Sequence, residues 1–254
     1  MTWSYFLYKG LNMKLSSLLS AVAFTCIFFA QVNSASCAMY IYPMEVAVGM
    51  KGTSQIKVIS QDKDVQFIKV NLKKVEQPGT AQEHEQSIYN ENASGLVITP
   101  EKIALSASSQ RLVRLVSIVP PEKETTWRAY FESVNDANFI PLPGSDTNSS
   151  KTANVGVNVV WGALIHVAPE KIVTSLKIVD DTGKVSNDGT IRIPINELGV
   201  CDESGQCQWK KLSSIVYPDT VVKLHDVSFD KSKSYRVKYK NWITRNDEEL
   251  TLSR

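Results

Sequence analysis

The 254-residue sequence is poor in the residue types and motifs from which catalytic and metal-binding sites are usually built. Its only histidines, His84, His166 and His225, fall in unrelated segments without a partner at triad or metal-ligand spacing. It has no nucleophile elbow, no zinc-binding helix motif and no phosphate-binding glycine loop. We therefore predict that the protein is not an enzyme and that it uses no metal, cofactor or small-molecule substrate. We expect His84 in a solvated loop and His225 in a half-exposed strand.

The sequence also lacks an excess of charge of one sign. Its formal net charge is only +2, which excludes the basic surplus typical of nucleic-acid-binding proteins. The first 38 residues hold two lysines and no acidic residue, so that removing them leaves 26 basic against 26 acidic residues.

No apolar run is long enough to be a clear membrane span. Residues 15–30 are apolar apart from small polar residues, a run of about 16, which is short for a bilayer. Lys14 precedes this run, and Ser36-Cys37-Ala38 follows it with the small-x-small pattern that signal peptidase reads. We predict that residues 1–38 are a signal peptide cleaved after Ala38. Either Met1 or Met13 could be the start.

Two alternatives to cleavage stay open. Residues 15–30 could be a retained membrane anchor, although no basic stop-transfer cluster follows them. Cys37 could be lipidated, although Ser34 stands where a lipoprotein normally has leucine.

Cleavage would remove two of the four cysteines and leave Cys201 and Cys207. An even pair in an oxidising compartment predicts a disulfide. The two cysteines have no nearby histidine with which to form a zinc site, and their spacing is not the C-x-x-C of a redox site. A loop this short would contribute roughly 2–3 kcal/mol as a local staple.

The sequence is rich in short segments that alternate apolar and polar residues, and no helical stripe exceeds about two turns. Strands are expected at residues 39–43, 54–60, 65–72, 95–100, 111–116, 127–134 and 155–167, and later at 174–179, 190–195, 220–227 and 234–239. Turn clusters separate them, and a long polar stretch covers residues 135–152. This cadence predicts an all-β protein of two immunoglobulin-like β-sandwich domains, residues 39–167 and 168–254.

Several blocks resemble the periplasmic chaperones of chaperone–usher pilus assembly, and most of all the alternate chaperones of class 5 fimbriae. The blocks are Met39-Tyr40-Ile41-Tyr42-Pro43, Lys73-Lys74, Pro78-Gly79-Thr80, Leu96-Val97-Ile98-Thr99-Pro100, Gln110-Arg111-Leu112-Val113-Arg114-Leu115, Trp127-Arg128-Ala129-Tyr130-Phe131-Glu132 and the strand from Val155. The resemblance implies two domains set at an angle with a cleft between them. It also implies a periplasmic chaperone that caps fimbrial subunits, both pilins and a tip adhesin, and delivers them to an outer-membrane usher.

The resemblance further implies donor-strand complementation, in which the chaperone lends a strand to a subunit that lacks one. Val155, Val157 and Val159 share one face of the expected donor strand, and no Lys, Arg, Asp or Glu occurs between residues 152 and 167. We expect residues 160–167 to be buried in the domain's own core. Such an edge could also pair with a second copy of the free protein.

The sequence departs from the family at the usual anchor for the subunit's C-terminal carboxylate, an Arg in the first strand and a Lys in the seventh. Residues 39–50 contain neither, and residues 161–164 are neutral. Arg128 is our substitute candidate, since a guanidinium can bond both carboxylate oxygens. An ion pair within the chain is the competing interpretation of Arg128, and His166 and Lys171 are weaker candidates.

A second function class remains open, that of a structural fimbrial subunit or adhesin with two β-sandwich domains. A pilin should carry its own alternating N-terminal donor extension. Residues 39–50 are short and interrupted by Pro43, which argues against this class.

Overall fold

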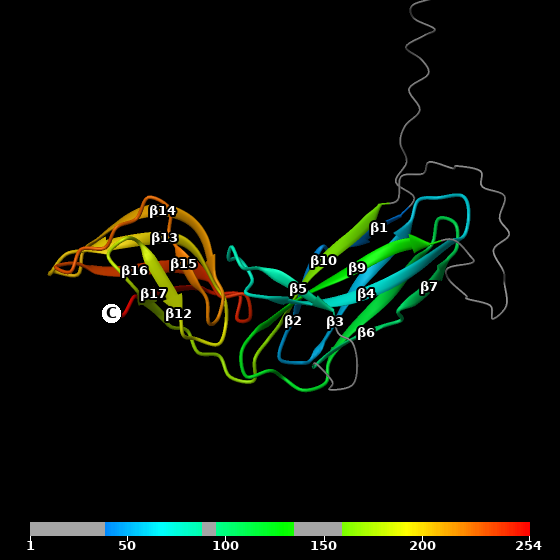
Figure 1. The fold of residues 1–254 in the computed structure, drawn as a ribbon, viewed down its shortest axis with the longest axis horizontal. Coiled ribbons are helices and arrows are strands. Elements are labelled where there is room, and N and C mark those ends of the chain that lie inside the picture. Colours follow the sequence, from blue (N-terminus) through cyan, green and yellow to red (C-terminus); the bar gives the residue numbers. More distant parts are fainter. Residues whose placement is uncertain (1–38, 88–94, 135–158) are drawn as a thin grey trace, which may run out of the picture. The chain divides into compact units, whose positions relative to one another are not determined.

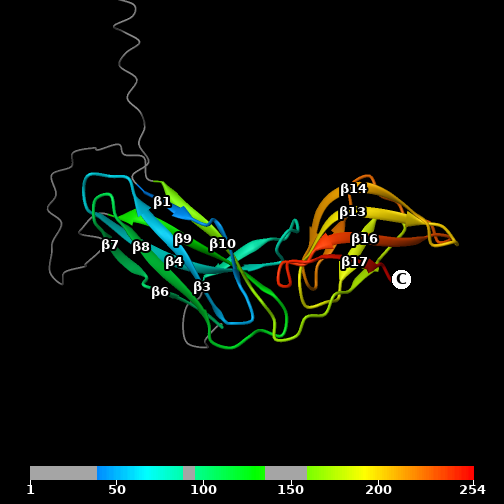
Figure 2. The same cartoon turned by 180° about the vertical axis from the view of Figure 1, so that it is seen from behind.

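The computed structural model of the chain describes residues 39–87, 95–134 and 159–254, and the regular elements in them are all strands (Figure 1). In these ranges no helix has the length and apolarity needed to cross a membrane. Figure 2 shows the same strands from behind. The predicted all-β fold class is confirmed.

Two sheets form the first sandwich, one in the order β1-β3-β8-β6 and the other in the order β2-β10-β9-β4-β5, with β7 also paired to β4. Their strands are β1 (Met39–Tyr42), β2 (Glu45–Val48), β3 (Thr53–Ser60), β4 (Gln66–Glu76), β5 (His84–Ser87), β6 (Leu96–Thr99), β7 (Lys102–Leu105), β8 (Gln110–Ser117), β9 (Thr125–Val134) and β10 (Val160–Val167). The break predicted at Pro43 is where the chain leaves the sheet of β1 for the sheet of β2. Proline cannot donate to a ladder, so a strand readily ends there.

The core of the first sandwich follows from alternation along each strand. On β9, Trp127, Ala129 and Phe131 are buried, whereas Arg128 and Tyr130 lie on the opposite face of the sheet. Period-two alternation places successive side chains on opposite faces, so one strand supplies both the core and an outward polar row.

Two further sheets form the second sandwich, in the orders β11-β12-β15 and β14-β13-β16-β17. Their strands are β11 (Leu176–Ile178), β12 (Lys184–Asn187), β13 (Ile193–Cys201), β14 (Cys207–Val216), β15 (Val221–Lys223), β16 (Ser234–Lys240) and β17 (Asp247–Thr251). The buried clusters of the two sandwiches draw on residues 39–167 and 176–252 respectively. The boundary at residue 168 stays a prediction.

Some expectations for two of the histidines and for one strand were wrong. His225 lies in a turn rather than a strand, and its side chain is 91% exposed. His84, in the first sandwich, begins β5 instead of lying in a loop, although it is exposed as expected. The ten-residue strand β14 was not predicted, because adjacent Lys210 and Lys211 are both exposed and interrupt its alternation. A register shift against β13 between Ile195 and Glu197 accompanies this interruption.

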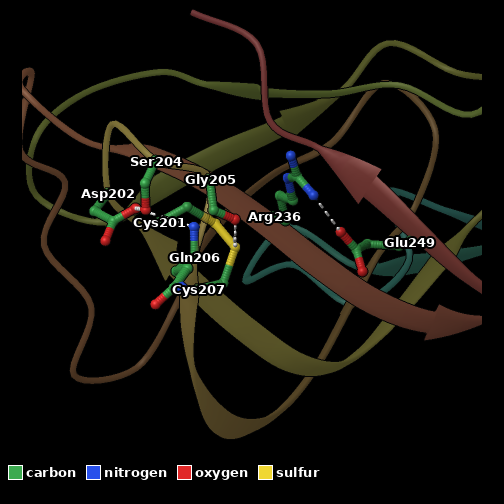
Figure 3. Close-up of a disulfide and its surroundings, with 8 residues drawn as sticks. All are labelled: Cys201, Asp202, Ser204, Gly205, Gln206, Cys207, Arg236 and Glu249. Carbon is green, nitrogen blue, oxygen red and sulfur yellow. Dashed lines mark hydrogen bonds and ion pairs between the residues drawn. A yellow bond between two sulfur atoms is a disulfide. The ribbon is translucent and has the colours of Figure 1, made fainter.

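The predicted disulfide between Cys201 and Cys207 is present and joins the last residue pair of the β13–β14 hairpin (Figure 3). The two Cα atoms are 3.9 Å apart. In the turn that it closes, Asp202 Oδ1 accepts hydrogen bonds from Ser204 Oγ at 2.6 Å and from the Gln206 backbone N–H at 3.0 Å. The disulfide therefore staples a turn within the second sandwich, as the cysteine spacing predicted.

Candidate functional site

Strand β10 is paired along its full length on one side and along only half of it on the other. It pairs antiparallel with β9 from Val160 to Val167, and it pairs parallel with β2 only from Leu164 to Val167. Figure 1 shows β9 lying between β10 and β4 in this sheet. Among the described residues, 160–163 thus form a strand edge with no second strand beside it. Such an edge presents backbone N–H and C=O groups to an incoming strand.

One side-chain contact borders this edge. The indole Nε1 of Trp161 donates a hydrogen bond to the carbonyl oxygen of Met39 at 2.8 Å. Trp161 is half-buried and packs against the core of the first sandwich. The contact ties the beginning of β1 to the edge of β10.

The three predicted donor valines fall only partly within the described residues. Val155 and Val157 lie outside them. Val159 directly precedes β10 and is 46% exposed.

The expectation that residues 160–167 are all core is wrong for the first part of β10. Val160 is 46% exposed, while Ala163, Ile165 and Val167 are buried. The core covers only one face of the strand at this end. By alternation, Val159 shares the face of Ala163 and Ile165.

Arg128 lies on the outward face of β9, where its backbone pairs with Leu164 of β10 and Lys73 of β4. Its side chain is 32% exposed and runs past Gly162, because a Cβ added at that glycine would lie 3.8 Å from Arg128 Cγ and Cδ. The same Cβ would lie 3.6 Å from Tyr130 Cε1. Arg128 and Tyr130 therefore stand beside the unpaired edge of β10.

The guanidinium of Arg128 already holds carboxylates of its own chain. Arg128 Nη1 donates to Glu85 Oε1 at 2.6 Å, and Arg128 Nη2 lies 3.5 Å from Glu83 Oε1. Glu85 also accepts a hydrogen bond from the Tyr130 hydroxyl and lies 3.3 Å from Lys73 Nζ. The intramolecular ion pair that competed with the anchor interpretation is thus present.

These contacts shift the protonation equilibria of the cluster. Partial burial raises the pKa of Glu85, but hydrogen bonds from Tyr130, Arg128 and Lys73 outweigh it and hold that pKa below its usual value. Burial and the hydrogen bond to Glu85 raise the pKa of the Tyr130 phenol. At neutral pH the cluster is a carboxylate held by two cations and a neutral phenol.

His166, the first weaker anchor candidate, belongs to a different and buried cluster. Its side chain is 1% exposed, with Nδ1 3.2 Å from Glu124 Oε1 and Nε2 3.5 Å from Glu45 Oε1. Glu124 also accepts hydrogen bonds from the Arg192 guanidinium at 2.9 Å and from Trp242 Nε1 at 2.8 Å. Burial lowers the pKa of His166. Its side chain is already surrounded by carboxylates of its own chain and is closed to one from a partner.

Lys171, the second weaker candidate, is exposed in the segment that follows β10. The sequence singled out Arg128 but none of its partners Glu85, Lys73 and Tyr130. A signal for Tyr130 and Lys73 was available. Like Arg128, both occupy outward positions on neighbouring strands. Within residues 39–87, 95–134 and 159–254, no group of three or more His, Cys, Asp or Glu side chains could hold a metal ion.

No protein-family model matches the chain. The chain is 30% identical over 194 residues to a CFA/I fimbrial subunit of Escherichia coli, covering 73% of this chain and 79% of that protein. It is 30% identical over 185 residues to a CS1 fimbrial subunit of Escherichia coli, covering 70% and 76%.

Solved structures give the same grouping. The crystal structure of the class 5 fimbriae chaperone CfaA matches with a TM-score of 0.69 and 26% identity over 84% of this chain and 97% of that chain. A chain from a chaperone–tip adhesin complex of CFA/I fimbriae biogenesis matches with a TM-score of 0.69 and 26% identity over 85% and 97%. Since these similarities span most of each protein and include both sandwiches, the chain belongs to the fimbrial chaperones of the chaperone–usher pathway, in the group of the class 5 chaperones.

Proposed function

We propose that this protein is a periplasmic chaperone that completes an unfinished fimbrial subunit with its own strand and delivers it to an outer-membrane usher. The observation that carries the proposal is the edge at residues 160–163 of β10, which has no second strand beside it among the described residues. The signal peptide predicted at residues 1–38 would direct the chain to the periplasm. The role is one of binding rather than catalysis. In the absence of a subunit, the same edge could pair with a second copy.

The donor strand would continue β10 toward its N-terminal side. If the alternation persists, Val155, Val157 and Val159 extend the row that Ala163 and Ile165 begin in the core. A subunit with a missing strand would then receive these valines in its own groove. Each fully buried valine contributes about 1.5 kcal/mol, so the three supply about 4–5 kcal/mol before ordering costs. A moderate affinity, made of several small side-chain contributions, suits a complex that must later release its subunit.

Arg128 would hold the C-terminal carboxylate of the subunit. Its guanidinium can bond both carboxylate oxygens, and it stands beside Gly162 at the open edge. A strand added to residues 160–163 would therefore run close to this side chain.

The donor strand is tested by Val157→Asp, with Val221→Asp as the matched control. Val221 is 52% exposed on β15 of the second sandwich and is not part of the proposed donor strand. Losing one valine contact alone should weaken the complex about tenfold, and a buried charge should weaken it further. Recovery of the co-expressed subunit with the chaperone should fall for Val157→Asp and stay at the wild-type level for Val221→Asp. Equal recovery with both variants would reject the donor strand.

A structural subunit or adhesin is the second candidate function, because both relatives from Escherichia coli carry the name fimbrial subunit. Size-exclusion chromatography separates the two. A chaperone should run as a monomer or a small capped oligomer, whereas a structural subunit should form a ladder of polymers.

A further inference from the structure

Glu85 occupies a complete carboxylate-binding arrangement. One of its oxygens accepts a hydrogen bond from Arg128 at 2.6 Å and another from the Tyr130 hydroxyl, and the other oxygen lies 3.3 Å from Lys73 Nζ. Three donors, two of them cationic, converge on one carboxylate. Charge-assisted hydrogen bonds of this kind are the strongest that proteins make, and an arginine with a second cation is a general recognition device for carboxylates.

The strand that carries Glu85 lies at the end of its sheet and is largely exposed. β5 has four residues, three of them exposed, and it ends the sheet order β2-β10-β9-β4-β5. Among the described residues, which stop at Ser87 on this strand, its ladder with β4 joins Lys73–Glu76 to β5. Short edge segments with few buried contacts open at low free energy. Glu85 therefore sits on an exposed edge strand, whereas β4 and β9 lie inside the sheet.

Two of the three donors that hold Glu85 lie beside the proposed binding edge. Arg128 and Tyr130 both border Gly162 of β10, and Lys73 pairs with Arg128 across β4 and β9. Without Glu85, Arg128 would be a positive charge beside that edge, and Lys73 a second one on the adjacent strand β4. The groups that would receive a carboxylate from a partner are the same groups that Glu85 now neutralises.

We infer that Lys73, Arg128 and Tyr130 form a carboxylate-binding site, that Glu85 fills it in the free chaperone, and that the C-terminal carboxylate of a bound subunit displaces Glu85. The inference rests on the proposed function and deepens it by naming the anchor site and its built-in competitor. Glu85 lowers the affinity of the free chaperone for any carboxylate and keeps two cations neutralised until a subunit docks.

The test compares Glu85→Gln with Glu76→Gln. Glu76 is the matched control because it is a half-buried glutamate on β4 paired with Lys74 at 2.6 Å. The probe is the subunit that co-purifies with the chaperone, prepared once with a free C-terminal carboxylate and once with a C-terminal amide. Dissociation constants for the two forms are measured by competition after dilution of the subunit from urea.

If Glu85 fills the site about nine-tenths of the time, removing its charge should tighten the complex with the free-acid form about tenfold. The gain should vanish with the amidated form and should not occur in Glu76→Gln. Arg128→Ala should bind both forms as weakly as the wild type binds the amide. Glu85→Asp keeps the charge but withdraws it by one methylene, and it should show an intermediate gain if Glu85→Gln fails to fold.

The possible failures are distinct. A wild-type protein that captures no subunit contradicts the proposed function itself. A wild-type protein that captures the subunit, with Glu85→Gln and Glu85→Asp binding it no more tightly than Glu76→Gln, overturns only the inference and makes Glu85 a structural tie between β5 and β9. A gain that persists with the amidated form also overturns it, since the released cations would then attract the subunit without binding its carboxylate.

Discussion

Replacing Glu124 by glutamine tests how strongly the buried ion pair beside β9 stabilises the protein. The Glu124 side chain is 0% exposed and accepts hydrogen bonds from the Arg192 backbone N–H at 2.8 Å, Arg192 Nη1 at 2.9 Å and Trp242 Nε1 at 2.8 Å. Glu124→Gln preserves the shape of the side chain but removes its charge. The NH₂ group of the glutamine then faces one of the N–H donors of Arg192 or Trp242. Breaking a buried ion pair by removing one partner costs about 3–5 kcal/mol.

The lower end of that range applies to Glu124→Gln. The glutamine keeps one acceptor oxygen, and Arg192 retains Glu45 Oε1 at 3.0 Å. We expect a loss of about 3 kcal/mol, which for a protein of this size lowers Tm by roughly 6–12 °C. Urea unfolding followed by tryptophan fluorescence measures the free energy, and differential scanning fluorimetry measures Tm.

The control is Glu122→Gln, an exposed carboxylate two residues away. It should change the free energy of unfolding by no more than about 0.5 kcal/mol. A loss below about 1 kcal/mol for Glu124→Gln, on the same unfolding transition, would refute the reasoning. It would mean that the desolvation cost of Glu124 and Arg192 cancels their attraction.

Two further predictions concern acid and the disulfide. Burial lowers the pKa of His166 from its usual 6.5, so the unfolded chain binds a proton more readily and the free energy of unfolding should fall as the pH drops below about 6.5. His166→Gln should flatten this slope between pH 7.5 and 5.5, and an unchanged slope would exclude His166 as its source. Replacing Cys201 and Cys207 by serine should cost about 2–3 kcal/mol. Dithiothreitol should destabilise the wild type by the same amount and leave this variant unaffected, whereas equal sensitivity of both would contradict a stabilising disulfide.

The strands that the sequence predicted well are those with uninterrupted alternation. β3, β8, β9 and β16 lie within two residues of their expected ranges at each end. Their inward positions carry apolar side chains that have one favourable environment, so local chemistry is enough to orient the strand. β14 escaped prediction because Lys210 and Lys211 break the alternation where the register shifts.

The candidate site was also predicted only in part from the sequence. Arg128 could be chosen from the sequence because the family's usual cations are missing and this arginine begins an aromatic-rich strand. Its partner Glu85 could not, because it is 43 residues away and becomes a neighbour only when β5 and β9 both join β4.

Residue type and spacing over short stretches of chain were enough to predict the all-β class, the pair of sandwiches, the disulfide and the apolar run that ends in β10. Three features emerge only in the folded chain. In the part of the chain that the structure describes, one edge of β10 has no second strand at residues 160–163. Arg128 holds Glu85, and Glu124 is buried with Arg192, 68 residues away. Strand order brings these groups together, and strand order follows from the packing of the whole sandwich rather than from any one segment.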